Sequence, residues 1–510
     1  MKKVLIIFIT ILFKQIILFS QGGFSKNYFL PNSVVSVCTD VIEAPNGNII
    51  MTGLTFDGPT GSNRLTIVGT DANGTELWQK SYGSDKFEYL DNFLSNRSLI
   101  KGNSSFYFYS CVRDSNNKYP SVLIKFNFNG DTLWQKKFYD TNDYLYIQGV
   151  AKSVDDGFLI TGFCAHPVNP IETTLIIKTD SNGNELWRKK INKPIPNGQN
   201  GSNIIQDSLT KKIVIAGYQY DGTASAYTGH ANIIVTDSLG TVLQRKTFSG
   251  GCSSFFIDLI QTKDKKCVAV GQNDQCDNLG GPNGTARHKG YALKFDLNNL
   301  NNVIWTKEFD QTCVYNSINT INELSNGDLI LGGRYDTLKN YSLPEKVMLR
   351  LIKTDKDGNV KWNKNLSRDN SNENSKFIRS LNVTSSGSYL TANWLYFAAN
   401  PKPYSITKID SMGCDSTVVY CQTVGLNENT INKNILSIYP NPTNDILNIE
   451  IENFNHDQNL TIKVVDILGR AILEIPFKEQ INLKDLKYGV YFLELYDKQK
   501  LISSRKIIKQ

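Results

Sequence analysis

The chain of 510 residues has little histidine, methionine or proline, with 4, 4 and 15 copies. It also lacks a strong charge of one sign. The formal net charge is +7, or +4 once three lysines of the first 20 residues are set aside. So mild and dispersed a charge excludes nucleic acid as the expected partner. A hydrophobic content of 40% and 37 glycines exclude a disordered or collagen-like chain. After residue 20 no apolar run is long enough to cross a bilayer, so we expect no transmembrane span in the mature protein.

The first 20 residues have the layout of a secretory signal peptide. Two lysines follow Met1, an apolar run covers residues 4–13 and 16–19, and Ser20 begins a small, polar stretch. This order of segments is typical of a cleaved leader. The alternative is a retained membrane anchor, which Lys14 and the shortness of the run disfavour. We therefore predict cleavage near Ser20 and an exported, soluble chain.

A repeat is the strongest internal pattern. Asp71-Ala-Asn-Gly-Thr-Glu-Leu-Trp78 returns as Asn127 to Trp134 and Asp180 to Trp187, and the same frame recurs at Asp237, Asp296, Asp355 and Asp410. These positions lie 53 to 59 residues apart. In each copy β-branched residues precede a turn in which the acidic or amide side chain caps the backbone and Gly takes a positive φ. The segment containing Trp then returns as a second strand.

Another pair of strands precedes each of these hairpins, as in residues 34–42 and 46–53. Four strands repeated in seven copies predict an all-β fold, a seven-bladed β-propeller over residues 27–423. An open solenoid is the alternative, but no polar capping repeat is evident. Because the spacing departs from those of quinoprotein and sialidase propeller motifs, we interpret the Trp as a residue that docks one blade on the next.

Residues 424–435 are polar and break the period, which indicates a linker. Seven short strand candidates follow between residues 436 and 510. That number of strands in so short a segment predicts a small Ig-like β-sandwich.

The last segment carries a set of motifs in a fixed order. They comprise Tyr439, Pro440, Asn441 and Pro442, then Asp466, Gly469 and Arg470, then Gly489 and Tyr491, and finally Lys506 and Lys509. In order and spacing the set resembles the type A C-terminal sorting domain of the type IX secretion system of Bacteroidetes. The resemblance implies that the type IX secretion machinery is a partner and carries the folded protein from the periplasm across the outer membrane. It also implies two fates for the cargo, release or attachment to surface lipopolysaccharide.

Nine cysteines in an exported chain suggest disulfides with one cysteine left over. Cys414 and Cys421 flank the end of the last repeat and form a candidate pair. Cys276 has two candidate partners, Cys252 and Cys313. We expect the remaining four to be buried thiols within strands, namely Cys38, Cys111, Cys164 and Cys267.

The sequence shows no motif for a catalytic residue, a metal or a cofactor. Three of the four histidines fall on one face of the expected ring, but in different blades and without metal-ligand spacing. Asp355-Lys-Asp357-Gly begins like a calcium loop but has no Glu at the twelfth position, so a turn is the preferred interpretation and a weak calcium site the alternative. Paired acids for glycoside hydrolysis meet in space rather than in sequence, which leaves an enzyme open.

Departures from the repeat locate the candidate binding site. The fifth and sixth blades have longer connections near 272–290 and 334–346, on the same face of the ring. Loops on one face of a rigid ring usually carry function. Arg287, His288 and Arg334 would supply hydrogen-bond donors there, and Trp394 and Tyr396 are candidate sugar-stacking residues.

Together these patterns predict a secreted or surface-attached propeller, monomeric and non-catalytic, that binds an extracellular glycan, protein or adhesion ligand. The alternative is a secreted polysaccharide hydrolase or lyase that uses the propeller face.

Overall fold

The computed structural model describes residues 23–413 and 436–510, apart from gaps at 85, 91–96, 117, 169–170, 192–197, 222–227, 249–252, 276–286, 310–315, 341–342, 367–372, 398–402, 452–459, 467–469 and 498–499. The chain divides into two compact units, residues 1–423 and 424–510. The division falls at the first residue of the expected linker. The expected leader, the linker, and the candidate pair Cys414 and Cys421 lie outside the described residues. Within these bounds the chain is all β, and no helix of the described chain is long and apolar enough to cross a membrane.

Successive antiparallel sheets make up the first unit. The first sheet contains β2 (Ser33–Glu43), β3 (Ile49–Asp57), β4 (Ser62–Thr70) and β5 (Glu76–Tyr82). The second contains β6 (Phe87–Leu90), β7 (Leu99–Lys101), β8 (Ser105–Asp114), β9 (Ser121–Asn127) and β10 (Thr132–Phe138). The third contains β11 (Tyr144–Lys152), β12 (Phe158–Ala165), β13 (Thr173–Thr179) and β14 (Glu185–Ile191). The fourth contains β15 (Gln199–Gln206), β16 (Ile213–Asp221), β17 (Thr228–Thr236) and β18 (Val242–Phe248). The fifth contains β19 (Ser253–Gln261), β20 (Cys267–Gln275), β21 (Arg287–Asp296) and β22 (Asn299–Phe309). The sixth contains β23 (Asn316–Glu323), β24 (Leu329–Asn340), β25 (Leu343–Thr354) and β26 (Val360–Leu366). The last sheet contains β27 (Glu373–Val383), β28 (Tyr389–Phe397), β29 (Tyr404–Ile409) and β1 (Phe24–Tyr28).

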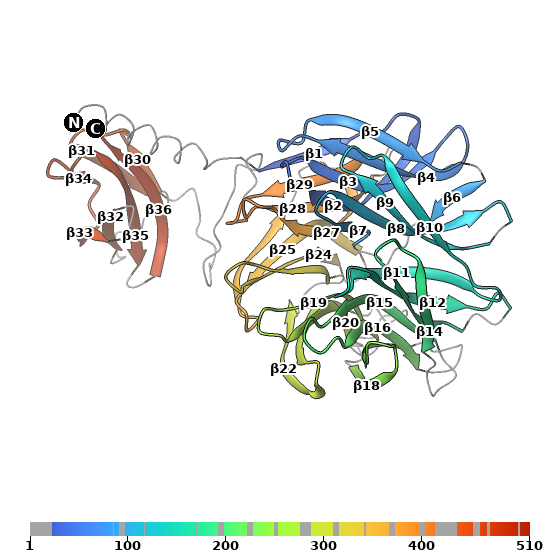
Figure 1. Cartoon of the computed structure of the whole chain (residues 1–510). Coiled ribbons are helices and arrows are strands. Elements are labelled where there is room, and N and C mark those ends of the chain that lie inside the picture. Colours follow the sequence, from blue (N-terminus) through green and yellow to red (C-terminus); the bar gives the residue numbers. More distant parts are fainter. Residues whose placement is uncertain are drawn as a thin grey trace, which may run out of the picture. The chain divides into compact units, whose positions relative to one another are not determined.

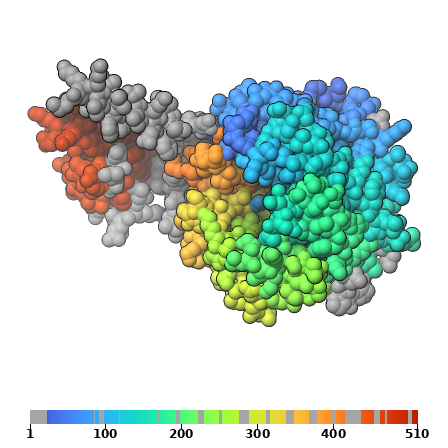
Figure 2. Space-filling view, viewed as in Figure 1, coloured from blue at the N-terminus to red at the C-terminus, as the bar shows by residue number. Residues whose placement is uncertain are grey.

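The sheets form a closed ring. The first strand of each sheet contacts the sheet before or after it, and β2 of the first sheet contacts β27, β28 and β29 of the last. The first strands β2, β11, β15, β19 and β27 surround the middle of this unit, and the fourth strands lie at its edge (Figure 1). In the space-filling view the colours pass round the unit in sequence order, so consecutive segments are neighbours (Figure 2). This is the β-propeller architecture that the repeat predicts.

The amino-terminal strand completes the last sheet. β1 pairs with β29 from Phe24 opposite Lys408 to Tyr28 opposite Tyr404. The sequence interpretation instead began the ring at residue 27 and took all four strands of the last repeat from its own segment. Because β1 lies at one end of the ring segment and β27 to β29 at the other, pairing them ties the two ends together.

The Trp of the repeat packs against the turn of the next sheet. A Cβ added to Gly130 would lie 2.7 Å from the ring of Trp78, and one added to Gly183 would lie 2.8 Å from Trp134. Trp187, Trp305 and Trp362 take the same position against Gly240, Gly358 and Gly413. At the closure Phe24 replaces Trp, beneath Gly74 of the first sheet. The docking role expected of the Trp is therefore confirmed.

The first strands carry a recurring β-bulge. In β2 the register shifts between Cys38 and Asp40, and β11, β15, β19, β23 and β27 shift at the equivalent place. Opposite the bulge of β2 lies Gly53, where a Cβ would lie 1.9 Å from the carbonyl oxygen of Val37. Only glycine allows this close approach, which explains the Gly at the end of the predicted second strands.

The second unit contains two sheets around one apolar core. Its strands are β30 (Leu436–Tyr439), β31 (Ile446–Ile451), β32 (Leu460–Asp466), β33 (Ala471–Pro476), β34 (Gln480–Asn482), β35 (Gly489–Asp497) and β36 (Lys500–Lys509). One sheet has the order β30-β31-β34 and the other β33-β32-β35-β36. The strand positions agree closely with the predicted candidates.

Candidate functional site

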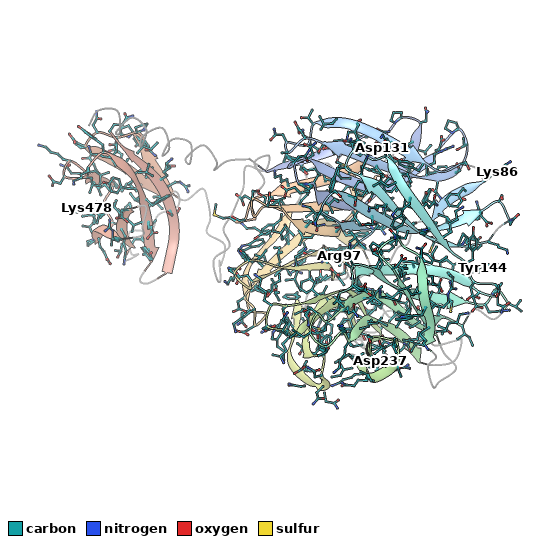
Figure 3. The ribbon with its side chains drawn as sticks, in the orientation of Figure 1. Lys86, Arg97, Asp131, Tyr144, Asp237 and Lys478 are labelled. Atoms are coloured by element: carbon teal, nitrogen blue, oxygen red, sulfur yellow. The ribbon has the colours of Figure 1, made fainter. Side chains whose placement is uncertain are left out.

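The middle of the ring contains an arginine that the repeat does not predict. In the second sheet both β6 and β7 pair with β8, Leu90 lying opposite Cys111 and Leu99 opposite Phe108. Residues 91–98 thus separate two positions that face residues three apart on β8, at the place where the other sheets have a one-residue bulge. Arg97, two residues before β7, is labelled near the middle of the ring in Figure 3.

Arg97 reaches the opposite side of the ring. Its Nε donates to Asp258 Oδ2 of the fifth sheet at 2.9 Å, and its guanidinium also donates to the carbonyl of Ile321 in the sixth sheet. Asp258 is fully buried and accepts further hydrogen bonds from the amides of Leu259 and Ile321, each at 2.9 Å, and from Asn203 at 2.5 Å. One carboxylate thus joins four sheets at the axis.

Asp40 holds the same position in the first sheet. It accepts hydrogen bonds from the amides of Val41 at 2.7 Å and Leu99 at 2.8 Å, and from the hydroxyl of Ser380. Burial raises the pKa of Asp40 to about 6, although these hydrogen bonds oppose the shift. Asp40 and Asp258 follow the bulge of their strands, so the bulges turn carboxylates toward neighbouring sheets. Arg97, Asp258 and Asp40 each bond neighbouring sheets, which assigns these three groups to holding the ring closed.

We use "loop face" for the face where second strands join third strands and fourth strands join the next sheet. The expected loops lie there, but they are partly strand. β24 and β25 extend the hairpin of the sixth sheet through most of 334–346, so the long spacing there reflects a longer hairpin. In the fifth sheet β20 and β21 cover the two ends of 272–290, and residues 276–286, Cys276 included, lie outside the described residues.

Two of the expected donors face carboxylates of their own hairpins. His288 Nδ1 lies 2.5 Å from Asp274 Oδ1, with Gln272 also bonded to the imidazole. Arg334 forms a two-pronged ion pair with Asp336, at 2.8 and 2.7 Å. Burial raises the pKa of Asp336, although Arg334 and, more weakly, His288 oppose the shift, so the two pairs are electrostatic neighbours. The side chain of Arg287, the first residue of β21, lies outside the described set.

The predicted stacking residues lie on β28. Trp394 is partly buried, and its ring meets that of Phe377 edge to face at 4.6 Å. This contact belongs to a cross-strand pair between β27 and β28. The side chain of Tyr396 is outside the described set, so its role stays a prediction.

A pocket that the sequence did not indicate opens on the loop face, between the second and third sheets. It has a volume of about 280 Å³. Its lining comes from the β8–β9 connection, the β10–β11 connection and the residues after β12, and comprises Asn116, Lys118, Tyr119, Pro120, Tyr139, Asp140, Thr141, Asn142, Asp143, Tyr144 and Pro167. Tyr144 is labelled in Figure 3, well away from Arg97. The sequence does place several Tyr, Asn and Asp in two nearby connections. Because turn residues are commonly polar, these residues are only a weak indication of a pocket.

The candidate metal and thiol positions have structural partners. Asp355 Oδ1 accepts the amides of Asp357 and Asn359, each at 2.9 Å, as the equivalent Asp180 does in its own turn. This is the turn that we preferred over a calcium loop. Among the described residues no group of three or more metal-ligating side chains converges. The four cysteines expected as buried thiols are confirmed as such, and burial raises the pKa of Cys164 to about 11 and of Cys267 to about 12.

In the second unit one part of the predicted sorting motif meets at the last strand, and the other part makes local contacts. Asn441, between Pro440 and Pro442, donates to the carbonyl of Lys506 at 2.6 Å and accepts the amide of Ile508 at 2.8 Å. Gly489 pairs with Lys509 across β35 and β36, and Asp466 is bonded by Arg470 at 2.7 Å. The hydroxyls of Tyr439 and Tyr491 bond Glu450 and the carbonyl of Lys487. Gly469 lies outside the described residues.

Residues 437–510 match the family described as a secretion system C-terminal sorting domain. This match supports the type IX sorting role that the motifs suggest. The sorting domain indicates that the chain is exported, to the cell surface or into the medium, and that secretion machinery handles it.

Other comparisons cover the chain differently. A stretch of 112 residues is 28% identical to an endo-acting ulvan lyase of Formosa agariphila, over 20% of this chain and 21% of that protein. The chain therefore matches about a fifth of the length of this curated relative. Among solved structures, the β-propeller domain of the Trilobed protease from Pyrococcus furiosus has a TM-score of 0.41 and 11% identity, covering 74% of this chain and 94% of that one. The Penicillium chrysogenum α-L-arabinanase with arabinobiose has a TM-score of 0.36 and 10% identity, covering 77% and 98%.

Proposed function

We propose that this protein is an exported seven-bladed β-propeller that binds an extracellular ligand on its loop face without chemical turnover. Each sheet of the first unit is one blade, and β1 completes the seventh. The second unit is an Ig-like sandwich that serves as the sorting signal, and the mature protein is a monomer.

The ion pair between Arg97 and Asp258 is the observation that carries this proposal. Propeller enzymes are expected to place convergent acids, or a His with an acid, in an open axial pocket. Here the Arg97 side chain crosses the axis and satisfies the buried carboxylate of Asp258, so these two groups are committed to structure. A concave site lined by aromatic and hydrogen-bonding side chains lies away from the axis, between the second and third sheets.

The pair of His288 and Asp274 favours a second candidate, a polysaccharide hydrolase or lyase. A carboxylate beside Nδ1 orients an imidazole as in general acid–base catalysis. The endo-acting ulvan lyase that shares a stretch of sequence acts, by its name, on a polysaccharide. In this candidate His288 would transfer the proton, and Arg334 would hold an acidic substrate group once displaced from Asp336.

The two candidates are separated by assaying one preparation of the mature protein on polysaccharides. The binding proposal predicts retention on a polysaccharide or glycan array and no release of shorter chains. Product formation that His288→Ala abolishes would replace it with the enzyme. Lys152→Ala, on another sheet, is the control that should leave any product formation unchanged.

A further inference from the structure

The tyrosines of the loop-face pocket support one another. Tyr119 and Tyr144 meet at 4.8 Å with an angle of 67° between their rings, and Tyr119 lies 6.3 Å from Tyr146. Tyr146 in turn stacks on Phe163 at 4.7 Å. The amide of Leu145 donates to the carbonyl of Tyr119 at 3.4 Å, which links the two connections. The rings are therefore held in place before any ligand arrives, which reduces the entropy lost on binding.

The acidic side of the pocket is also fixed. Asp140 Oδ1 accepts the amides of Asn142 and Asp143, at 3.1 and 3.2 Å. Lys190 of β14 lies 2.9 Å from Asp140 Oδ2 and 2.7 Å from Asp143 Oδ2, and Arg188 lies 3.5 Å from Asp140. Although burial acts to raise the pKa of Asp140, the hydrogen bonds from Lys190 and the turn hold it below its usual value.

The charges of the pocket nearly cancel. Lys118 stands in the lining with Asp140 and Asp143, and Arg188 and Lys190 pair with these carboxylates. Such a site has no excess of either sign with which to attract a strongly charged ligand. What remains are aromatic rings, carboxylate oxygens, amides and hydroxyls, which suit a ligand with both an apolar face and many hydroxyls.

The volume of about 280 Å³ lies just below the usual range for small-molecule sites, roughly 300–1,000 Å³. It therefore suits a terminal sugar or a branch rather than a long stretch of polymer. A peptide ligand would be expected to add main-chain hydrogen bonds along a sheet edge. The lining instead consists of connections between strands.

We propose that this pocket binds a saccharide, through one uncharged, hydroxylated sugar ring that packs on the tyrosines and hydrogen-bonds to Asn142 and Asn116. The inference rests on the proposed function and names the ligand class and its place on the loop face. It moves the site from the fifth and sixth blades, where the sequence put it, to the second and third.

Calorimetric titration of the mature full-length protein tests the proposal. The probes are glucose, galactose, mannose, xylose, rhamnose and N-acetylglucosamine with their β-linked disaccharides, and galacturonate as a charged probe. Tyr139→Ala removes a ring that is 45% exposed, and Asn142→Ala removes an exposed amide, so both variants should fold. Tyr488→Ala removes a ring that is 83% exposed in the sorting domain and is the matched control.

The expected result is saturable binding of at least one neutral sugar, weakened about tenfold by Tyr139→Ala or Asn142→Ala, a difference of about 1.4 kcal/mol. Tyr488→Ala should stay within about twofold of wild type, since its ring lies in the other unit. Unchanged affinity in both pocket variants with equal melting temperatures would overturn the site but leave the proposed function standing. Tighter binding of galacturonate, or no binding of any probe, would overturn the ligand class. Retention on intact polysaccharides would then show whether the proposed function survives.

Discussion

Arg97 of the second sheet pairs with Asp258 of the fifth across the axis, with 2.8 Å between its Nη2 and Asp258 Oδ2. The arginine side chain is 28% exposed and the aspartate is fully buried. Since the buried partner also accepts bonds from three sheets, the pair acts as a cross-brace of the ring.

Replacing Asp258 with Ala should therefore destabilise the first unit by about 3 kcal/mol or more, because buried donors of several sheets lose their acceptor. Equilibrium unfolding in urea measures the change. Asp357→Ala, which breaks the exposed pair with Lys356, is the control and should change the free energy of unfolding by less than about 0.5 kcal/mol. Equal effects of the two substitutions would show that the axial pair does not brace the ring.

The packing of Trp78 against the turn of the next sheet makes a prediction with a close internal control. Gly130 and Gly47 share a φ of 83°, but a Cβ on Gly130 would meet Trp78 at 2.7 Å whereas nothing lies within 4 Å of one on Gly47. Gly47→Ala should lower the free energy of unfolding by about 1 kcal/mol through backbone strain alone. Gly130→Ala should cost a further 1 to 3 kcal/mol, roughly, because the ring must move. Chemical denaturation compares them, and equal losses would mean that the Trp contact contributes nothing.

Ring closure depends on the amino-terminal strand. Phe24→Ala should destabilise the first unit by about 3 kcal/mol, since its buried ring packs beneath the turn at Gly74. Removing residues 21–28 should do more, because it leaves the edge of β29 unpaired and open to another chain. Size-exclusion chromatography with light scattering should show self-association of the truncated protein, with intact protein as the control. A stable, monomeric truncation would contradict the closure.

Glu172 should make stability depend on pH. Burial raises its pKa to about 7 from an ordinary 4.5, with Asn200 opposing the shift. Its neutral form is favoured in the folded state. The contribution of Glu172 to the free energy of unfolding is therefore complete below pH 4.5 and is lost as the pH rises through about 7. Glu172→Gln should remove this loss and make the protein about 1 to 2 kcal/mol more stable than wild type at pH 8, after allowance for partial exposure. Unfolding measured from pH 4.5 to 8 tests the sign, with the exposed Glu76→Gln as control.

Export should depend on the second unit but folding of the propeller should not. Deleting residues 436–510 should leave the protein in the periplasm with the first unit folded, since the two units have separate cores. Asn441→Ala, which frees the Pro-Asn-Pro segment from β36, should reduce export more than the exposed Tyr488→Ala. Immunoblots of periplasm, surface and medium measure this. Normal release of the truncated chain would refute the sorting role.

Much of the fold follows from the sequence because it depends on local patterns that repeat. The turn at Asp71, the positive φ of Gly74 and the docking Trp78 form one local unit, and each recurrence strengthens the inference. The strands of the second unit were placed closely because short alternating runs and turns fix them.

The parts that the sequence did not predict depend on contacts between distant segments. The role of β1 requires pairing between Phe24 and Lys408, which no local pattern encodes, although Phe24-Ser-Lys26 matches Trp-x-Lys of the repeat. The segment that carries Arg97 does not lengthen its repeat, because the spacing from Trp78 to Gly102 is within one residue of the spacing from Trp134 to Gly157. The repeat length therefore does not indicate that this segment is unusual. The pocket combines three connections that only the ring brings together.

Binding and turnover of a polysaccharide measured on the same mature protein test the central claim most directly. The account predicts saturable binding, no shortening of the polymer over many hours, and weaker binding in Tyr139→Ala. Steady release of shorter chains that His288→Ala abolishes, with Tyr139→Ala unaffected, would contradict it.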